Sequence, residues 1–146
     1  MTRRRTLPGM ALDPRALPAA VREFLAERHL ATLTTLRPDG TPHVVPIGFT
    51  WDDEAGLARV ITGRTSRKAR HLDGGGRVAL CQVDGGRWLT LEGDAVVTDD
   101  PARVAEAVRR YADRYRQPRP NPDRVAVEVS VDRVLGLVQR AGGLPS

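Results

Sequence analysis

The chain has 146 residues, 40% of them hydrophobic and 28% charged, with a formal net charge of +5 at pH 7, which suits one globular domain with its own core. The positive charge favours anionic partners, but 4% aromatic residues and the lack of a helix-turn-helix, zinc-finger or RNA-stacking signature argue against nucleic acid. No run is long enough to span a membrane, and the only cysteine, Cys81, excludes an intrachain disulfide, so we expect a cytoplasmic protein.

Both ends of the chain lack a sustained hydrophobic period. Residues 1–17 hold prolines, a glycine and basic side chains, which predicts a flexible N-terminal segment. The arginines at positions 3–5 are not followed by an apolar run, so no secretory signal is predicted. We expect one folded domain over residues 18–140 and a tail over residues 141–146.

The domain is expected to begin with a helix and a hairpin. Apolar residues recur at helical spacing over residues 18–29 and predict a short amphipathic helix. Residues 30–36 are rich in threonine and leucine and predict a strand. The Pro-Asp-Gly sequence at 38–40 predicts a tight turn, because proline fixes φ and glycine accepts a positive φ.

The second and third strands follow this turn. Side chains of residues 43–51 alternate between two faces, both of which carry apolar residues, and this predicts the second strand. Pro46 and Gly48 interrupt the pattern. A proline and a glycine inside a strand indicate an edge, a bulge, or a place where a ligand or another backbone comes close. After a turn at residues 52–56, residues 57–62 predict the third strand.

Residues 63–72 concentrate basic and hydroxyl side chains where the third strand leads into a helix. Thr65 or Ser66 is the expected N-cap, and Lys68, the only lysine among 23 basic residues, falls in the first turn. Helix N-termini offer unpaired N–H groups to anions, and guanidinium and ammonium groups add charge-assisted hydrogen bonds. The pattern predicts a phosphate site; the alternative is a short surface helix with a solvated basic face.

A second hairpin and a longer helix come next. Residues 78–83 and 88–97 predict the hairpin strands around an Asp-Gly-Gly turn. Asp99 or Asp100 is the expected N-cap of the helix, because a proline occupies its first position. We expect this helix to end near Arg116.

The last part of the chain completes the expected architecture. Three prolines within residues 118–122 exclude regular structure there. Residues 125–131 predict the sixth strand, which can continue through residues 134–138. Six strands joined mostly by hairpins predict a mainly β fold, an antiparallel barrel with peripheral helices. The glycine run at 74–76 precedes a strand rather than a helix, so no dinucleotide-binding fingerprint is present.

The residues offer little independent catalytic chemistry. The three histidines and the single cysteine lack the spacing of metal ligands, so no metal site is predicted. None of the three serines lies in a nucleophile elbow, and the catalytic residues remain unknown. An enzyme built on this chain would therefore take its reactivity from a cofactor.

Four stretches carry a family resemblance: ATLTTLRPDGTPHVVPIGF, VITGRTSRKARHL, RVALCQVDGGRWLTLEG and PRPNPDRVAVEVSVDRVLG. Together they resemble the flavin- and deazaflavin-dependent oxidoreductases related to pyridoxamine 5′-phosphate oxidase, over residues 21–138. The resemblance implies a six-stranded split β-barrel of the FMN-binding type. Within this superfamily the chain most resembles the F420-dependent biliverdin reductases, through DGGRWLTLEG and RYRQPRPNP.

The resemblance implies a homodimer with two cofactor sites at the subunit interface, and it assigns roles to individual positions. Trp88 stands where flavin-using relatives often carry a polar residue, a departure that argues against flavin. Arg119 would reach the cofactor or substrate of the facing subunit. The cofactor-binding residues that the resemblance implies are His43, Val44, Val45, Pro46, Ile61, Thr62, Ser66, Arg67, Lys68, Trp88 and Arg119.

Each of these positions also has an ordinary structural interpretation. His43 can be a strand-end histidine, and Pro46 with Gly48 can mark an edge bulge without a ligand. Trp51 and Trp88 can be anchors of the core or of a dimer interface. The proline-braced loop before the last strand can be a rigid connector.

The predicted function is hydride transfer from reduced coenzyme F420 to a conjugated, carboxylate-bearing small molecule, in particular biliverdin to bilirubin. No membrane or nucleic-acid partner is expected. Three alternatives remain open: an FMN-dependent enzyme of the pyridoxamine 5′-phosphate oxidase type, a non-catalytic flavin- or deazaflavin-binding protein, and a basic nucleic-acid-binding barrel.

Overall fold

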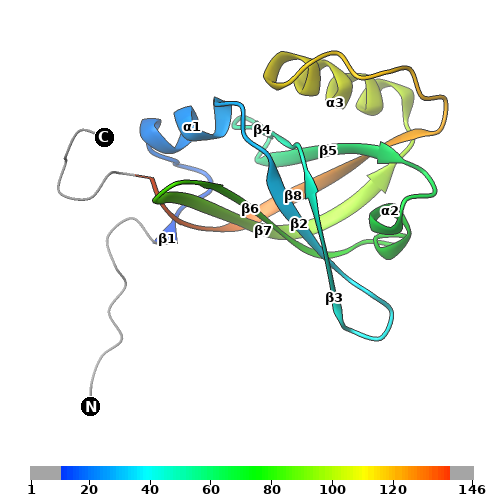
Figure 1. The fold of residues 1–146 in the computed structure, drawn as a ribbon, viewed down its shortest axis with the longest axis horizontal. Coiled ribbons are helices and arrows are strands. Elements are labelled where there is room, and N and C mark those ends of the chain that lie inside the picture. The colour runs from blue at the N-terminus through cyan, green and yellow to red at the C-terminus, as the bar shows by residue number, and fades with distance from the viewer. Residues whose placement is uncertain (1–10, 139–146) are drawn as a thin grey trace.

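The computed structural model describes residues 11–138, and the chain folds as a mainly β protein with three helices among those residues (Figure 1). The helices are α1 Ala19–Ala26, α2 Arg67–His71 and α3 Pro101–Arg114. The strands are β1 Ala11–Leu12, β2 Ala31–Leu36, β3 Pro42–Ile47, β4 Thr50–Asp52, β5 Leu57–Gly63, β6 Gly76–Asp84, β7 Arg87–Thr98 and β8 Arg124–Leu137. The mainly β prediction is confirmed.

The strands form one antiparallel sheet that curls on itself. Its order is β3-β2-β6-β7-β8-β5-β4, with β1 paired to β8. The two ends of this order, β3 and β4, are joined in the chain by Gly48 and Phe49 alone. Because two linking residues reach at most roughly 11 Å, the end of β3 lies near the start of β4, and the sheet is a barrel split between these two strands. The predicted count of six strands is too low, since eight are present in residues 11–138.

The predicted second strand, residues 43–51, is wrong as a single element, because it breaks into β3 and β4. At the break, the Phe49 N–H donates to the Tyr115 hydroxyl at 3.2 Å instead of to a neighbouring strand. A Cβ on Gly48 would lie 2.9 Å from the ring of Tyr115. The glycine therefore lets α3 lie close to the corner that closes the barrel.

The ends of the domain also differ from the prediction. β8 is one continuous strand of 14 residues, and it absorbs a register shift opposite Glu92 and Gly93. Residues 11–12, expected to be part of a flexible segment, pair with Val134 and Leu135 of β8 as β1. The rest of that segment up to residue 10, and the predicted tail 141–146, lie outside the described residues.

The core fills the inside of the curled sheet. α1 inserts Val21, Phe24 and Leu25, all at most 2% exposed, as the helical spacing predicted. The other members that are 1% exposed or less are Leu33, Phe49, Ala58, Val60, Leu80, Leu89, Leu91, Ala95, Val127, Val129 and Val134. No helix in residues 11–138 has the length and apolar character needed to cross a bilayer.

α3 lies over β4, β5 and β8 and attaches mainly through charge (Figure 1). Ala107 is its only buried residue. Arg103 contacts the buried carboxylate of Glu128, and Arg110 contacts buried Asp52 at 3.1 Å. Asp100 accepts the N–H of Arg103 at 3.0 Å, so Asp100 is the N-cap of the two candidates.

Candidate functional site

The predicted cationic helix start exists where β5 ends. Ser66 is the N-cap of α2: its Oγ accepts the Ala69 N–H at 3.2 Å and the Thr62 hydroxyl at 3.0 Å. Because Oγ is the acceptor in both bonds, the hydroxyl hydrogen of Ser66 remains available to a ligand. The helix is only five residues long, so side chains carry most of what this segment can offer an anion.

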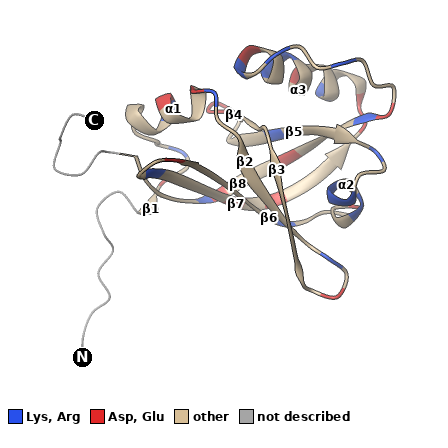
Figure 2. Ribbon diagram, in the orientation of Figure 1, with Lys and Arg blue, Asp and Glu red and all other residues tan. Residues whose placement is uncertain are grey.

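Basic residues make up most of α2 (Figure 2). Arg67 is exposed and Lys68 is half-buried, and neither forms an ion pair with any residue in the described range 11–138. Burial lowers the pKa of the Lys68 ammonium. The neighbouring Arg64 is different, because it contacts Asp99 at 3.2 Å. Arg67 and Lys68 thus lack an acidic partner within the described residues, which favours an incoming anion.

The histidine of β3 meets α2 in a cluster that the sequence did not reveal. His43 and buried Thr35 are cross-strand partners. The Thr35 hydroxyl lies 2.8 Å from Nδ1 of His71, and the His71 ring stands edge-on to His43 with centroids 4.9 Å apart. Nδ1 of His43 is buried without a hydrogen-bond partner among the described residues. Desolvation first, and then the charges of His71, Arg37 and other nearby cations, lower the pKa of His43.

The remaining residues of β3 divide between the two faces of the sheet. Val45 is half-buried and packs against the core. Val44 and Pro46 are exposed on the outer face, Val44 by 55%. His43 and Val45 therefore lie on the barrel side, and Val44 and Pro46 are free to meet another surface.

Three predicted residues line one pocket of about 280 Å³ beside α3. They are Ile61 and Thr62 of β5 and Lys68 of α2. The rest of the wall comes from the barrel corner, from α3 and from the segment before β8: Ile47, Gly48, Gly63, Tyr111, Pro118, Asn121 and Arg124.

Trp88 is not brought to this pocket within one chain, and Arg119 lies beside the pocket without lining it. Trp88 pairs with Val83 and Leu137 near the start of β7, ten residues or roughly 33 Å along the strand from Thr98, which lies at the α3 end. Arg119 is exposed in the loop before β8, and its main-chain oxygen accepts a hydrogen bond from Arg124 at 2.6 Å. Their predicted roles would need a second subunit.

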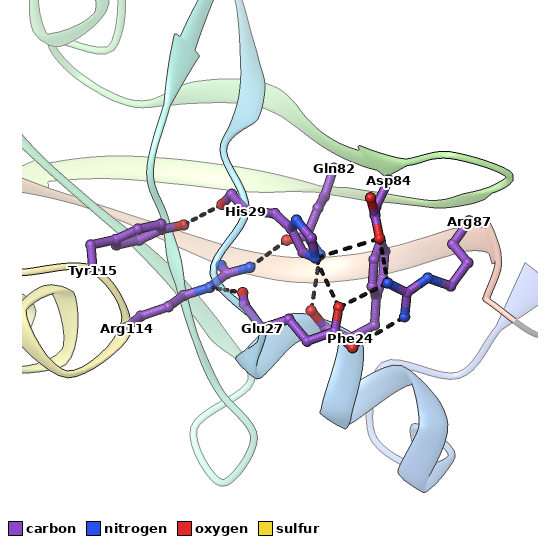
Figure 3. A network of polar contacts seen from close by, with 8 residues as sticks. All are labelled: Phe24, Glu27, His29, Gln82, Asp84, Arg87, Arg114 and Tyr115. Carbon is purple, nitrogen blue, oxygen red and sulfur yellow. Dashed lines mark hydrogen bonds and ion pairs between the residues drawn. The ribbon is translucent and has the colours of Figure 1, made fainter. Parts of the chain in front are cut away.

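A different polar cluster joins α1, the β6–β7 hairpin and α3 (Figure 3). Glu27, His29 and Asp84 place one possible metal-ligand atom each within 4.8 Å of one another. Arg87, however, donates to Glu27 at 2.9 and 3.1 Å and also to Asp84. The hydrogen bonds from Arg87 and His29 lower the pKa of Glu27 to about 2. The guanidinium already bonds to both carboxylates, so we interpret the cluster as structural.

The α3 end of the same network is held by Arg114 (Figure 3). Its guanidinium donates to the main-chain oxygens of Glu27 at 2.8 Å and Phe49 at 2.6 Å, and to Gln82 Oε1 at 2.5 Å. The Gln82 amide in turn donates to Phe24 O at 2.9 Å. These bonds satisfy the end of α1 and fix the barrel corner, which positions one wall of the pocket beside α3.

A phosphate-bearing flavin or deazaflavin fits the α2 end of the barrel. The unpaired charges of Arg67 and Lys68 suit a phosphate, and the orphaned Nδ1 of His43 suits a polar group of the ligand. Thr35 and His71 belong to the same cluster but were not predicted as site residues. His71 lies within the cationic stretch, so the sequence could have indicated it as a site residue. Thr35 joins the cluster only through strand register.

Comparison with known proteins places the chain in a family. The family model for pyridoxamine 5′-phosphate oxidase matches residues 17–137. A Mycobacterium tuberculosis (strain CDC 1551 / Oshkosh) protein named F420H(2)-dependent biliverdin reductase is 58% identical over 113 residues, which are 77% of this chain and 82% of that protein. A solved structure named F420 reductase is 28% identical with a TM-score of 0.66, covering 81% of this chain and 98% of that one.

A second solved structure agrees in fold. The conserved hypothetical protein Rv2991 of Mycobacterium tuberculosis has a TM-score of 0.77 at 24% identity, covering 99% of this chain and 95% of that one. The match over residues 17–137 spans strands β2 to β8, α2 and the pocket beside it. The resemblance predicted from the sequence is confirmed: the chain belongs to the pyridoxamine 5′-phosphate oxidase family.

Proposed function

We propose that this protein is an F420-dependent oxidoreductase that reduces biliverdin to bilirubin. The observation that carries the proposal is 58% identity, over most of both chains, to a protein named F420H(2)-dependent biliverdin reductase. A solved structure named F420 reductase supports the same cofactor. The unpaired cations of α2 supply the anion site that such a cofactor needs.

The cofactor-binding residues follow from the α2 end of the barrel. Ser66, Arg67 and Lys68 hold the phosphate, and Ile61 and Thr62 line the chain that leads to it. His43 through Pro46 lie against the ring system and its side chain. Bound F420H2 supplies the hydride; the protein's contribution is to position the two reactants and to exclude water. We assign no residue as the proton donor.

The proposed assembly is a homodimer with cofactor sites at its interface. The outer face of β2, β3, β6, β7 and β8 carries no charged residue over a block of thirteen positions, of which Val44 is 55% and Val83 59% exposed. The block consists of Thr32, Thr34, Leu36, Pro42, Val44, Pro46, Ala79, Cys81, Val83, Trp88, Thr90, Leu135 and Leu137. A neutral surface of this extent suits a second copy of the chain, which would bring Trp88 and Arg119 to the partner's cofactor.

Turnover tests the function. The purified protein is mixed with F420H2 and biliverdin, and oxidation of the cofactor is followed together with bilirubin formation. We expect both to proceed in equal amounts and to depend on the protein. If neither F420H2 nor biliverdin is consumed, the proposed reaction is contradicted.

Cofactor binding tests the site. Replacing Arg67 and Lys68 together by alanine should weaken F420 binding by 100-fold or more, because two charge-assisted hydrogen bonds contribute roughly 3 to 6 kcal/mol. The control is Arg22→Ala on the exposed face of α1, which should leave the Kd unchanged. An unchanged Kd in the double variant would remove the anchoring role.

A second candidate is an FMN-dependent enzyme, favoured by the description of the matching family model as pyridoxamine 5′-phosphate oxidase. The discriminating measurement is a competition titration with FMN and F420. Tighter binding of FMN would support this alternative.

A cytoplasmic location stays a prediction of the sequence, consistent with the free, half-buried thiol of Cys81.

A further inference from the structure

The pocket of about 280 Å³ beside α3 holds two cations that come from separate elements. Lys68 belongs to α2 and Arg124 is the first residue of β8. No aspartate or glutamate is among the described residues of its wall. The wall therefore carries two formal positive charges and no negative one.

Neither cation is neutralised by a carboxylate within residues 11–138. Burial is the one cause that shifts the pKa of Lys68, and it lowers that pKa. Arg124 donates from Nη2 to the main-chain oxygen of Arg119 at 2.6 Å, a neutral acceptor that leaves its charge uncompensated. Because partly buried charge without a counter-ion is costly, this arrangement favours an incoming anion.

Other arginine-lined pockets of the described residues differ in this respect. The pocket that includes Arg64 also contains Asp99, and the two side chains lie 3.2 Å apart. The pocket that includes Arg109, Arg110 and Arg114 also contains Asp113, 3.4 Å from Arg109, and Arg110 contacts Asp52 at 3.1 Å. Each of these two walls thus includes a carboxylate that pairs with one of its arginines. The pocket of Lys68 and Arg124 differs from both because its wall includes no carboxylate.

The rest of the wall adds a neutral donor and open space. Oδ1 of Asn121 accepts the Asp123 N–H at 2.9 Å, so the NH2 group of the same amide is free to donate to a ligand. Gly63 has no side chain, and a Cβ there would lie 3.8 Å from Asn121 Nδ2. Ile61 and Pro118 make the remaining surface apolar. The donors are therefore reachable by a group that enters the pocket.

We propose that this pocket binds an oxyanion, held between the Lys68 ammonium and the Arg124 guanidinium, with the Asn121 amide as a third donor. The inference rests on the proposed function, which supplies two sources of that chemistry: the phosphate of the cofactor and the carboxylates of the substrate. A volume of about 280 Å³ is below the 300–1,000 Å³ typical of small-molecule sites, so the pocket receives one group rather than a whole ligand. Arg124 contributes a planar fork that can bind two oxygens at once, which an ammonium cannot.

The test compares Arg124→Gln with Arg133→Gln, a control on the same strand whose side chain is 67% exposed. The first probe is inorganic phosphate, added to each variant at constant ionic strength while Tm is measured. Phosphate should raise the Tm of the wild type and of Arg133→Gln, and should raise that of Arg124→Gln by less than half as much. Arg124→Lys should recover part of the response, because it retains the charge.

Ligand binding then separates the two sources. If the cofactor phosphate enters the pocket, Arg124→Gln raises the Kd for F420 by 10-fold or more without substrate present. If a substrate carboxylate enters it, the Kd for F420 is unchanged, the KM for biliverdin rises, and the KM for biliverdin dimethyl ester does not.

The outcomes also distinguish the pocket from the proposed function. A phosphate response that depends on Arg124, in a protein that binds no F420, would retain the pocket and overturn the cofactor assignment. The proposed oxyanion site would be overturned if Arg124→Gln and Arg133→Gln had the same Tm response to phosphate, the same Kd for F420 and the same KM for biliverdin. This holds even for a protein that reduces biliverdin.

Discussion

His43 is the residue whose surroundings most affect its chemistry. It faces His71, Arg37, Arg67 and Lys68 without a carboxylate partner, and Nδ1 is cut off from water. Desolvation and these positive charges favour the neutral imidazole. A neutral ring can accept a hydrogen bond from the ligand or donate one to it, whereas a protonated ring can only donate.

We predict that His43 titrates below the ordinary histidine pKa of about 6.5. The unfolded chain then binds a proton more readily than the native state, so His43 makes stability fall as the pH decreases below about 6.5, and the loss levels off below the native pKa. Histidine NMR shifts measured against pH will give this value. The chain has only three histidines, so substitution to asparagine assigns each resonance. A His43 midpoint at or above 6.5 would contradict the prediction.

At the scale of elements, α3 combines a half-buried apolar stripe with ion pairs to the buried carboxylates of Asp52 and Glu128. Asp52 is 8% exposed and accepts from Arg59 at 2.9 Å, the Ala55 N–H at 3.1 Å and Arg110 at 3.1 Å. Burial raises the pKa of Asp52, but these bonds and charges outweigh it and lower the pKa overall. Asp52 therefore stabilises the native state above its unfolded pKa of 3.8, and this contribution is lost as the pH falls through the native pKa.

Asp52→Asn should destabilise the protein by roughly 2 to 4 kcal/mol, because it leaves two guanidinium groups beside a neutral amide. Urea unfolding at neutral pH measures the change. Asp113→Asn is the control: its side chain is 74% exposed and lies 3.4 Å from Arg109, so the change should stay within about 0.5 kcal/mol. Equal effects of the two substitutions would show that α3 does not depend on the buried carboxylate.

The bulge between β7 and β8 requires a glycine. A Cβ on Gly93 would lie 2.0 Å from the main-chain oxygen of Ser130, which cannot move without disturbing the pairing. Gly93→Ala should therefore cost roughly 3 kcal/mol, measured by urea unfolding. Gly86→Ala, where a Cβ meets nothing within 4 Å, should be nearly neutral. A stable Gly93→Ala variant would mean that the two strands separate more easily than their close pairing suggests.

The sequence predicted those features that depend on residues close together in the chain. Each N-cap was predicted to within two neighbouring residues, Ser66 with Thr65 and Asp100 with Asp99, because a cap uses neighbours two or three residues away. The break at Gly48 was visible as an irregularity, but its cause, Tyr115, lies 67 residues further along the chain. The Thr35–His71 contact depends on strand register and on the placement of α2, so no local pattern could predict it.

The whole molecule presents a neutral sheet face that the proposed dimer would cover. Leu36→Glu and Val83→Glu each place a charge in this face, where the side chains are 50% and 59% exposed. We expect either change to shift the protein toward the monomer and to weaken F420 binding, because the proposed cofactor sites lie at the proposed interface. Sedimentation velocity measures the first effect. Ala20→Glu, at an exposed position of α1, adds the same charge outside the face and should have neither effect. A monomeric wild type would contradict the dimer.

The most direct test of the account is a single turnover. The protein is saturated with F420H2 without oxygen, mixed with excess biliverdin, and the absorbance of both is recorded in time. We expect each equivalent of bound F420H2 to be oxidised and to yield one equivalent of bilirubin. A cofactor that binds but stays reduced, or a protein that takes up FMN in its place, would contradict it.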